Sequence, residues 1–215
     1  GKTTVLSQWR ARLLAAGVKV AWYTASERER EPQAVLHMLA RALDLAGVDM
    51  ADTGLLDTPD AEPRAALDAI LLKLETTPGE LVLVVDEYER VENPRVAAII
   101  EGLVETAPDT AHLVIGSRRR PSLAVSVLRA QGVVRTIDAG ELRFSIQELG
   151  ALLDLPEDSP DLAIIAERTE GWPVAVALYR LWRARSGGDD SLSPLFSGQV
   201  AEVAEYLTEQ VFATL

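Results

Sequence analysis

The 215-residue sequence contains no cysteine, which excludes a disulfide framework and any metal site built from thiolates. It also contains no apolar stretch of the roughly 20 residues that a membrane-spanning helix requires, so we expect no membrane partner. Basic residues are scarce, because 21 Lys and Arg stand against 33 Asp and Glu, giving a net charge of −12. An acidic chain repels phosphate backbones and is not expected to bind nucleic acid non-specifically. The lack of cysteine fits a reducing compartment, and we expect a cytoplasmic protein.

Strand and helix patterns alternate over roughly the first two thirds of the chain. The apolar run at 81–85, which stops at two acidic residues, is typical of a central strand buried on both faces of a parallel sheet. This alternation predicts a three-layer α/β domain with a parallel sheet over residues 1–143. Besides the central run, the segments with strand patterns are 18–26, 112–121 and 133–140.

After about residue 143 the strand patterns cease, and helix patterns follow one another. Ser145 and Glu148 have the spacing of a capping box, which predicts a helix start. We expect a small all-helical, lid-like domain over residues 144–188. Residues 189–215 are expected to be a polar linker and the start of a further helical region.

The chain opens with Gly-Lys-Thr-Thr, the tail of a phosphate-binding loop of the form G-x-x-x-x-G-K-[ST]. In such a loop the backbone N–H groups and the N-terminus of the following helix bind phosphate. We expect Gly1, Lys2, Thr3 and Thr4 to contact the phosphates of a nucleotide, with the preceding strand and glycine-rich turn upstream of Gly1. The alternative is a surface lysine in the first turn of a helix.

Asp86 and Glu87 directly follow the apolar run. Nucleotide-hydrolysing P-loop proteins hold Mg²⁺ with a P-loop Ser or Thr and an Asp at the end of an apolar strand. Asp86 is therefore the predicted metal ligand together with Thr3, and Glu87 is placed to polarise an attacking water. The alternative is an ordinary acidic turn after a strand.

Two further motifs stand near expected element ends. Arg118 follows the strand pattern at 112–121, at the sheet edge where α/β proteins bind ligands, so its guanidinium is a candidate to read a terminal phosphate. The alternative is a solvated basic turn, which is the favoured interpretation for Arg119 and Arg120. Gly171-Trp172-Pro173 stands at the start of a helix pattern, and proline is common at the first position of helices.

Five motifs occur in order along essentially the whole chain: GKTTVLSQW, LVLVVDEYERV, HLVIGSRRRPSLAVSVLRAQG, ELRFSIQELGALL and RTEGWPVAVAL. Together they resemble the nucleotide-binding module of the MalT-like, large ATP-binding LuxR-type transcription regulators, which are AAA+-related signal-transduction ATPases of the STAND class. The resemblance implies that Lys2 and Thr3 bind phosphate and Mg²⁺, that Asp86 and Glu87 form the Walker B pair, and that Arg118 is a sensor. Glu87 stands where members of this subfamily often have a second Asp.

The resemblance also implies that Gly171 and Pro173 belong to the G-x-P motif of the class, whose proline packs near the adenine. The implied function is a switch that binds ATP or ADP with Mg²⁺, hydrolyses ATP slowly and controls self-association. DNA would be bound only through another domain of such regulators, and no part of this sequence resembles that domain. Two alternatives stay open: a motor or loader ATPase with continuous turnover, and a structural α/β module with a decayed site.

Overall fold

The computed structural model describes residues 2–124, 126–130 and 132–185. These residues form two compact units, Lys2–Arg135 and a second unit that begins at Thr136. Each unit is described by itself. The expected region 189–215 lies outside the described residues, and the expected domain limits stay a prediction.

The first unit is built on a three-stranded parallel sheet. Its strands are β1 (Lys19–Thr24), β2 (Leu81–Asp86) and β3 (Ala111–Ile115), in the order β1-β2-β3. All six residues of β2 are buried, as the apolar run predicted for a central strand. The register pairs Thr24 with Asp86 and Val85 with Ile115, so the carboxyl ends of the three strands share one edge.

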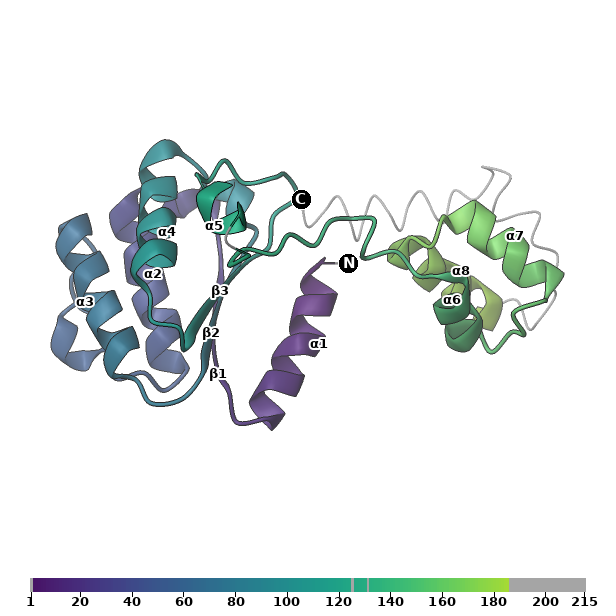
Figure 1. Cartoon of the computed structure of the whole chain (residues 1–215), viewed down its shortest axis with the longest axis horizontal. Coiled ribbons are helices and arrows are strands. Elements are labelled where there is room, and N and C mark those ends of the chain that lie inside the picture. Colours follow the sequence, from purple (N-terminus) through teal and green to yellow (C-terminus); the bar gives the residue numbers. More distant parts are fainter. Residues whose placement is uncertain (1, 125, 131, 186–215) are drawn as a thin grey trace. The chain divides into compact units, whose positions relative to one another are not determined.

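Helices cover both faces of this sheet, which confirms the layered α/β arrangement (Figure 1). On one face lie α2 (Pro32–Leu45), α3 (Pro63–Thr76) and α4 (Pro94–Thr106), which supply most of the main apolar core. On the other face lies α1 (Lys2–Ala15), whose Leu6 and Leu13 pack against the buried valines of β1 and β2. Four short elements complete the unit: η1 (Glu27–Glu29), η2 (Ala51–Thr53), η3 (Tyr88–Arg90) and α5 (Ser126–Ala130).

Local sequence signals explain where several helices begin and end. Proline occupies the first position of α2, α3 and α4, where its missing N–H costs no hydrogen bond. The side chain of Asn93 caps α4 by accepting hydrogen bonds from the N–H groups of Arg95 and Val96. Gly17 follows the end of α1 with φ of +79°, a conformation that glycine adopts without a Cβ penalty.

The second unit is helical in its described part, as predicted. It contains α6 (Ile146–Leu153), α7 (Pro160–Thr169) and α8 (Pro173–Arg185). The capping box is present, with Ser145 and Glu148 exchanging two side chain–backbone hydrogen bonds. Hydrogen bonding of the Glu148 carboxylate by the main-chain N–H of Ser145, and then by the Ser145 side chain, holds the pKa of Glu148 below its ordinary value. The small core of this unit consists of Leu149, Leu153, Leu162, Ile165, Val176 and Tyr179.

The predicted strand at 133–140 is wrong. The described residues of this segment form turns and irregular backbone, and Val133 and Ile137 are 65% and 58% exposed. A strand needs a neighbour for its N–H and C=O groups, and no strand of the described part pairs with this segment. The β-branched residues give this segment a propensity to form a strand, but that propensity alone does not make one without a partner strand.

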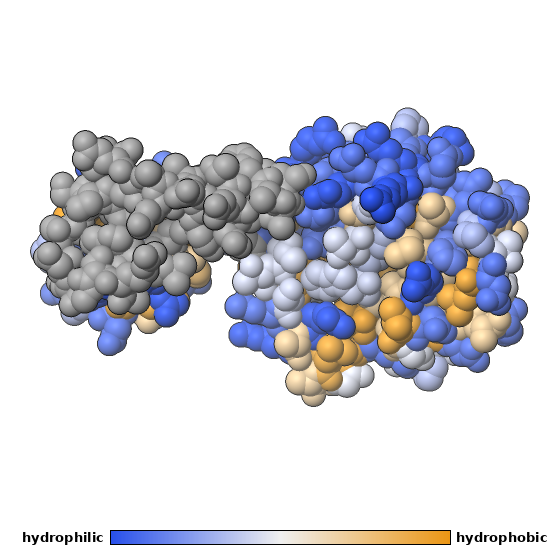
Figure 2. Space-filling model, turned by 180° about the vertical axis from the view of Figure 1, so that it is seen from behind, coloured by the Kyte–Doolittle hydropathy of each residue, from blue (hydrophilic) through white to orange (hydrophobic). Residues whose placement is uncertain are grey.

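On the face of the first unit that Figure 2 shows, hydrophilic residues predominate and smaller apolar areas lie between them. Among the exposed large apolar side chains of this unit are Val5, Trp9 and Leu14 of α1. Within the described residues, no helix combines the length and the hydrophobicity needed to cross a bilayer.

Candidate functional site

The carboxyl edge of the sheet brings together two motifs that are 83 residues apart in the sequence. The hydroxyl of Thr3, in the first turn of α1, donates a hydrogen bond of 2.9 Å to Oδ2 of Asp86 at the end of β2. This bond places the N-terminus of α1 at the sheet edge where the strands end. Free backbone N–H groups in the first turn of a helix form an anion-binding surface.

Asp86 is held in a defined orientation. The residue is only 1% exposed, and its Oδ1 accepts a hydrogen bond of 3.0 Å from the N–H of Glu87. Its main-chain oxygen accepts another from the N–H of Ala25, which follows β1. A buried carboxylate needs such partners, since an unpaired charge in the interior is strongly unfavourable.

The donor set at this edge fits Mg²⁺. A hydroxyl from Thr3 and a carboxylate from Asp86 are hard oxygen ligands 2.9 Å apart. No group of three or more His, Cys, Asp or Glu side chains in the described part of the chain could hold a metal by itself. Mg²⁺ commonly takes one or two protein ligands, keeps several waters and completes its shell with substrate phosphates. The residues present therefore suit a metal ion that arrives with a nucleotide.

The remaining residues of the opening motif lie beside Thr3. Lys2 is the first residue of α1 and is partly exposed, and Thr4 is exposed in the same turn. Gly1 lies outside the described residues. The sequence-predicted phosphate and metal residues Lys2, Thr3 and Asp86 thus share one edge of the first unit.

Glu87 adopts an unusual backbone conformation with φ of 56°. Left-handed backbone is uncommon in residues other than glycine and is enriched at functional sites. Its carboxylate is 2.6 Å from Nε of Arg90, and both side chains are 26% exposed. In this arrangement the predicted catalytic base is engaged by a neighbouring cation, so its use in catalysis requires this ion pair to rearrange.

Arg118 is bound to a glutamate that the sequence analysis did not single out. Nε of Arg118 is 3.4 Å from Oε1 of Glu89, and the Arg118 N–H donates to Oε2 at 3.2 Å. The Glu89 side chain is 13% exposed and that of Arg118 is 44% exposed. In the sequence, Glu89 stands out only as one of the acidic residues of the DEYER motif at 86–90. This motif gives no indication that its partner is Arg118.

Two more glutamates fix the loop that carries Arg118. Glu92 accepts a hydrogen bond of 2.6 Å from the N–H of Ser122, and Glu101 accepts one of 2.5 Å from the N–H of Ala124. With Glu89 they form three carboxylate contacts to the main chain of residues 118–124. The arginine loop is therefore anchored to η3 and α4.

Gly171 and Pro173 lie in the second unit, which is described by itself. Gly171 has φ of +69°, and a Cβ at this position would overlap the carbonyl oxygen of Phe144. Backbone packing thus accounts for this glycine without a ligand. Pro173 begins α8, and the half-exposed Trp172 lines a cavity of about 370 Å³ together with Arg168.

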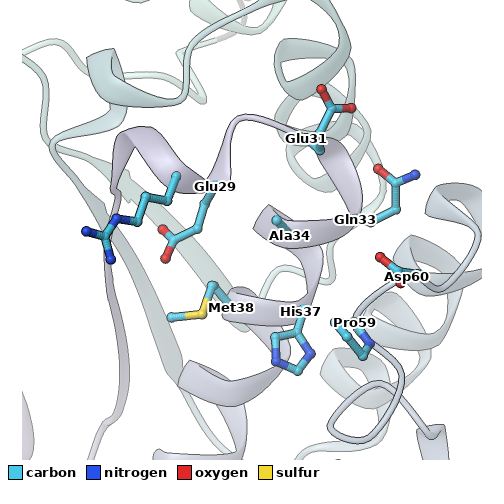
Figure 3. A pocket seen from close by; sticks show the side chains of 9 residues that line it. Glu29, Glu31, Gln33, Ala34, His37, Met38, Pro59 and Asp60 are labelled. Atoms are coloured by element: carbon cyan, nitrogen blue, oxygen red, sulfur yellow. The ribbon is translucent and has the colours of Figure 1, made fainter.

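A second cavity, of about 360 Å³, lies in the first unit beside the N-terminal half of α2 (Figure 3). Carboxylates from Glu29, Glu31 and Asp60 line it together with His37, and none of the predicted site residues does. Glu29 already accepts a hydrogen bond of 2.9 Å from the hydroxyl of Tyr23. Burial, and then this glutamate, raise the pKa of Tyr23.

Comparison with known proteins gives similarity over essentially the whole chain. This chain is 28% identical over 223 residues to the serine/threonine-protein kinase PknK of Mycobacterium tuberculosis. The match covers 100% of this chain and 20% of that protein. The chain is 26% identical over 220 residues to the HTH-type transcriptional regulator MalT of Serratia proteamaculans, and 25% identical to MalT of Yersinia enterocolitica. Both regulator matches cover 98% of this chain and 24% of the regulator. No family model matches the chain.

These relatives confirm the resemblance to MalT-like regulators that the ordered motifs predicted. The chain spans only about a fifth to a quarter of the length of these curated proteins. The similarity supports a nucleotide-binding module of the STAND type. It is also consistent with a DNA-binding part of such regulators that lies outside the matched region.

Proposed function

We propose that this chain is the nucleotide-binding switch module of a signal-transduction regulator, and that it binds ATP or ADP with Mg²⁺. The observation that carries the proposal is the hydrogen bond between Thr3 and the buried Asp86. It joins a Gly-Lys-Thr helix start to a carboxylate at the end of a buried central strand. These are the two parts that a P-loop protein uses to hold phosphate and metal.

In this proposal the N-terminus of α1 binds the phosphates through the N–H groups of Gly1–Thr4 and through the ammonium of Lys2. Thr3 and Asp86 hold Mg²⁺, which neutralises phosphate charge when bound. Their hydrogen bond keeps the two oxygen ligands adjacent before a metal ion arrives.

We further propose that hydrolysis is slow and that it serves to reset the switch. Glu87 is the candidate general base, yet its carboxylate is paired with Arg90 at 2.6 Å. A base must be within hydrogen-bond reach of the water from which it takes a proton. Breaking this ion pair adds a conformational step before catalysis, which favours a switch over an enzyme with continuous turnover.

The proposed readout of the nucleotide is Arg118, whose guanidinium is held by Glu89. A terminal phosphate can compete with Glu89 for this cation, whereas ADP lacks that phosphate. The helical domain over residues 144–188 would contact the adenine through Gly171 and Pro173, and the ATP state would self-associate. DNA binding would belong to a domain outside this chain.

The test replaces Lys2 by alanine in the full-length protein. A charge-assisted hydrogen bond contributes about 1.5–3 kcal/mol, so we expect affinity for both nucleotides to fall roughly 10- to 100-fold with an unchanged circular dichroism spectrum. Lys19→Ala is the matched control, because Lys19 lies at the opposite end of β1 and donates to the carbonyl oxygen of Pro78. Equal affinities of the Lys2→Ala variant and the wild type would reject the site. Rapid continuous turnover by the wild type would favour the motor alternative.

A further inference from the structure

We propose that Gly116 is a positioning residue for Asp86. The inference rests on the proposed function and goes further, because it assigns a metal-orienting role to a residue that the sequence analysis did not single out. The missing side chain at position 116 provides the space in which the Asp86 carboxylate stands in its metal-binding orientation.

The backbone of Gly116 is fixed on both sides. Its N–H donates to the carbonyl oxygen of Val85 at 2.8 Å, and its own carbonyl oxygen accepts from the N–H of Tyr88 at 3.0 Å. The residue is buried immediately after β3. A side chain added at this position therefore could not be accommodated by a free shift of the main chain.

The space around Gly116 is filled by the Asp86 carboxylate. A Cβ at position 116 would lie 2.5 Å from Oδ1 and 3.4 Å from Cγ of Asp86, and 3.2 Å from Cδ1 of Leu6. The first distance is far inside van der Waals contact, whereas the end of the Leu6 side chain can move by a few tenths of an ångström. The steric conflict therefore falls mainly on the carboxylate.

The conformation of Gly116 does not itself require glycine. Its φ is not among the positive values of this chain, so alanine can adopt the same backbone. The main obstacle to alanine is then the Asp86 oxygen that accepts from the N–H of Glu87. Rotation of the carboxylate away from a new Cβ would disturb this bond and the bond from Thr3 together.

The consequence is specific to metal-dependent binding. Residues that orient a metal ligand typically contribute 10- to 100-fold to metal affinity or activity. Gly116→Ala should therefore lower nucleotide affinity in Mg²⁺ by roughly 10-fold or more. Affinity for ADP measured in excess EDTA should stay within about twofold of wild type, since the phosphate-binding N–H groups of α1 are untouched.

The experiment measures ADP binding by full-length protein in Mg²⁺ and in EDTA, and follows Mn²⁺ with ADP by electron paramagnetic resonance. Gly102→Ala is the matched control, because its Cβ would meet only the flexible end of Leu67, at 3.0 Å. We expect Gly116→Ala to lose Mn²⁺ affinity and Gly102→Ala to retain it. A Gly116→Ala variant that binds Mn²⁺ and Mg²⁺–ADP as wild type does would overturn the inference.

Two additional variants separate positioning from general destabilisation. If Gly116→Ala does not fold, the Leu6→Ala/Gly116→Ala variant removes the contact with α1 and keeps the conflict with Asp86. In an Asp86→Ala background, Gly116→Ala should cause no further loss of Mg²⁺-dependent affinity, and an equal further loss would overturn the inference. Wild-type protein that binds no nucleotide overturns the proposed function instead. Normal wild-type binding with an unaffected Gly116→Ala variant overturns only the positioning role.

Discussion

Glu89→Gln removes the negative charge opposite the Arg118 guanidinium. It leaves a side-chain oxygen that can still accept the hydrogen bond from the main-chain N–H of Arg118. The gross Coulomb attraction across 3.4 Å is about 5 kcal/mol at an effective dielectric constant of about 20. Arg118 is 44% exposed, so solvent screening reduces the net value to about 1 kcal/mol. Because this arginine is partly solvated, its release should cost the protein little stability.

In the proposed switch, the terminal phosphate of ATP must displace Glu89 from Arg118. Removing the competing charge should therefore raise ATP affinity relative to ADP by about fivefold, the factor that corresponds to about 1 kcal/mol. ADP affinity itself should change little, because ADP does not carry the phosphate that competes.

The assay titrates the full-length variant with ATP and with ADP at the same Mg²⁺ concentration, over times too short for hydrolysis. Glu92→Gln is the control, since Glu92 anchors the same loop through the N–H of Ser122. An ATP-to-ADP affinity ratio that is unchanged or lowered in Glu89→Gln would refute the competition. An equal rise in the control would assign the effect to loop mobility instead.

The remaining predictions concern Glu87 and two tyrosines of the first unit. Glu87→Gln should bind ATP yet lower its turnover by about 10²- to 10⁴-fold in a single-turnover phosphate-release assay, and wild-type turnover would exclude a general base at this position. Tyr23→Phe should lower the free energy of unfolding by about 1 kcal/mol in urea, because it removes a hydroxyl bonded to Glu29. Tyr88→Phe should leave this free energy unchanged or raise it, because the buried Tyr88 hydroxyl has no hydrogen-bond partner in the described part of the chain. Burial, and then two nearby glutamates, raise the pKa of Tyr88 to about 12, and the pKa of Tyr23 is also raised. Both tyrosines would ionise near pH 10 when unfolded, so wild-type stability should fall above that pH, and the Tyr23→Phe/Tyr88→Phe variant should show a weaker fall.

The elements of the first unit followed from sequence where one local signal decided the outcome. The apolar run ending at Asp86 predicted a central strand, because only burial on both faces accommodates such a run. Proline starts and the glycine after α1 marked helix limits through their own backbone restrictions. The capping spacing of Ser145 and Glu148 likewise predicted a local hydrogen-bond pair.

Features that depend on distant partners were not predictable in this way. The pattern at 133–140 has β-branched residues, but a strand forms only where another strand supplies hydrogen bonds. The link between Glu89 and Arg118 spans 29 residues, and no local periodicity encodes it. The role proposed for Gly116 was equally hidden, because it depends on the carboxylate of a neighbouring strand rather than on a turn.

The pairing of charges at the carboxyl edge bears on why this site would act as a switch. Glu87 holds Arg90, and Glu89 holds Arg118, so both cations are already neutralised in the structure. A ligand shifts an equilibrium only by the difference in its affinity for the two states. A terminal phosphate that must take Arg118 from Glu89 gains only the excess of the new attraction over the old. In the proposed switch this competition therefore limits the free energy by which ATP and ADP, which share the same adenine, sugar and first two phosphates, can differ in their effect on the state of the module.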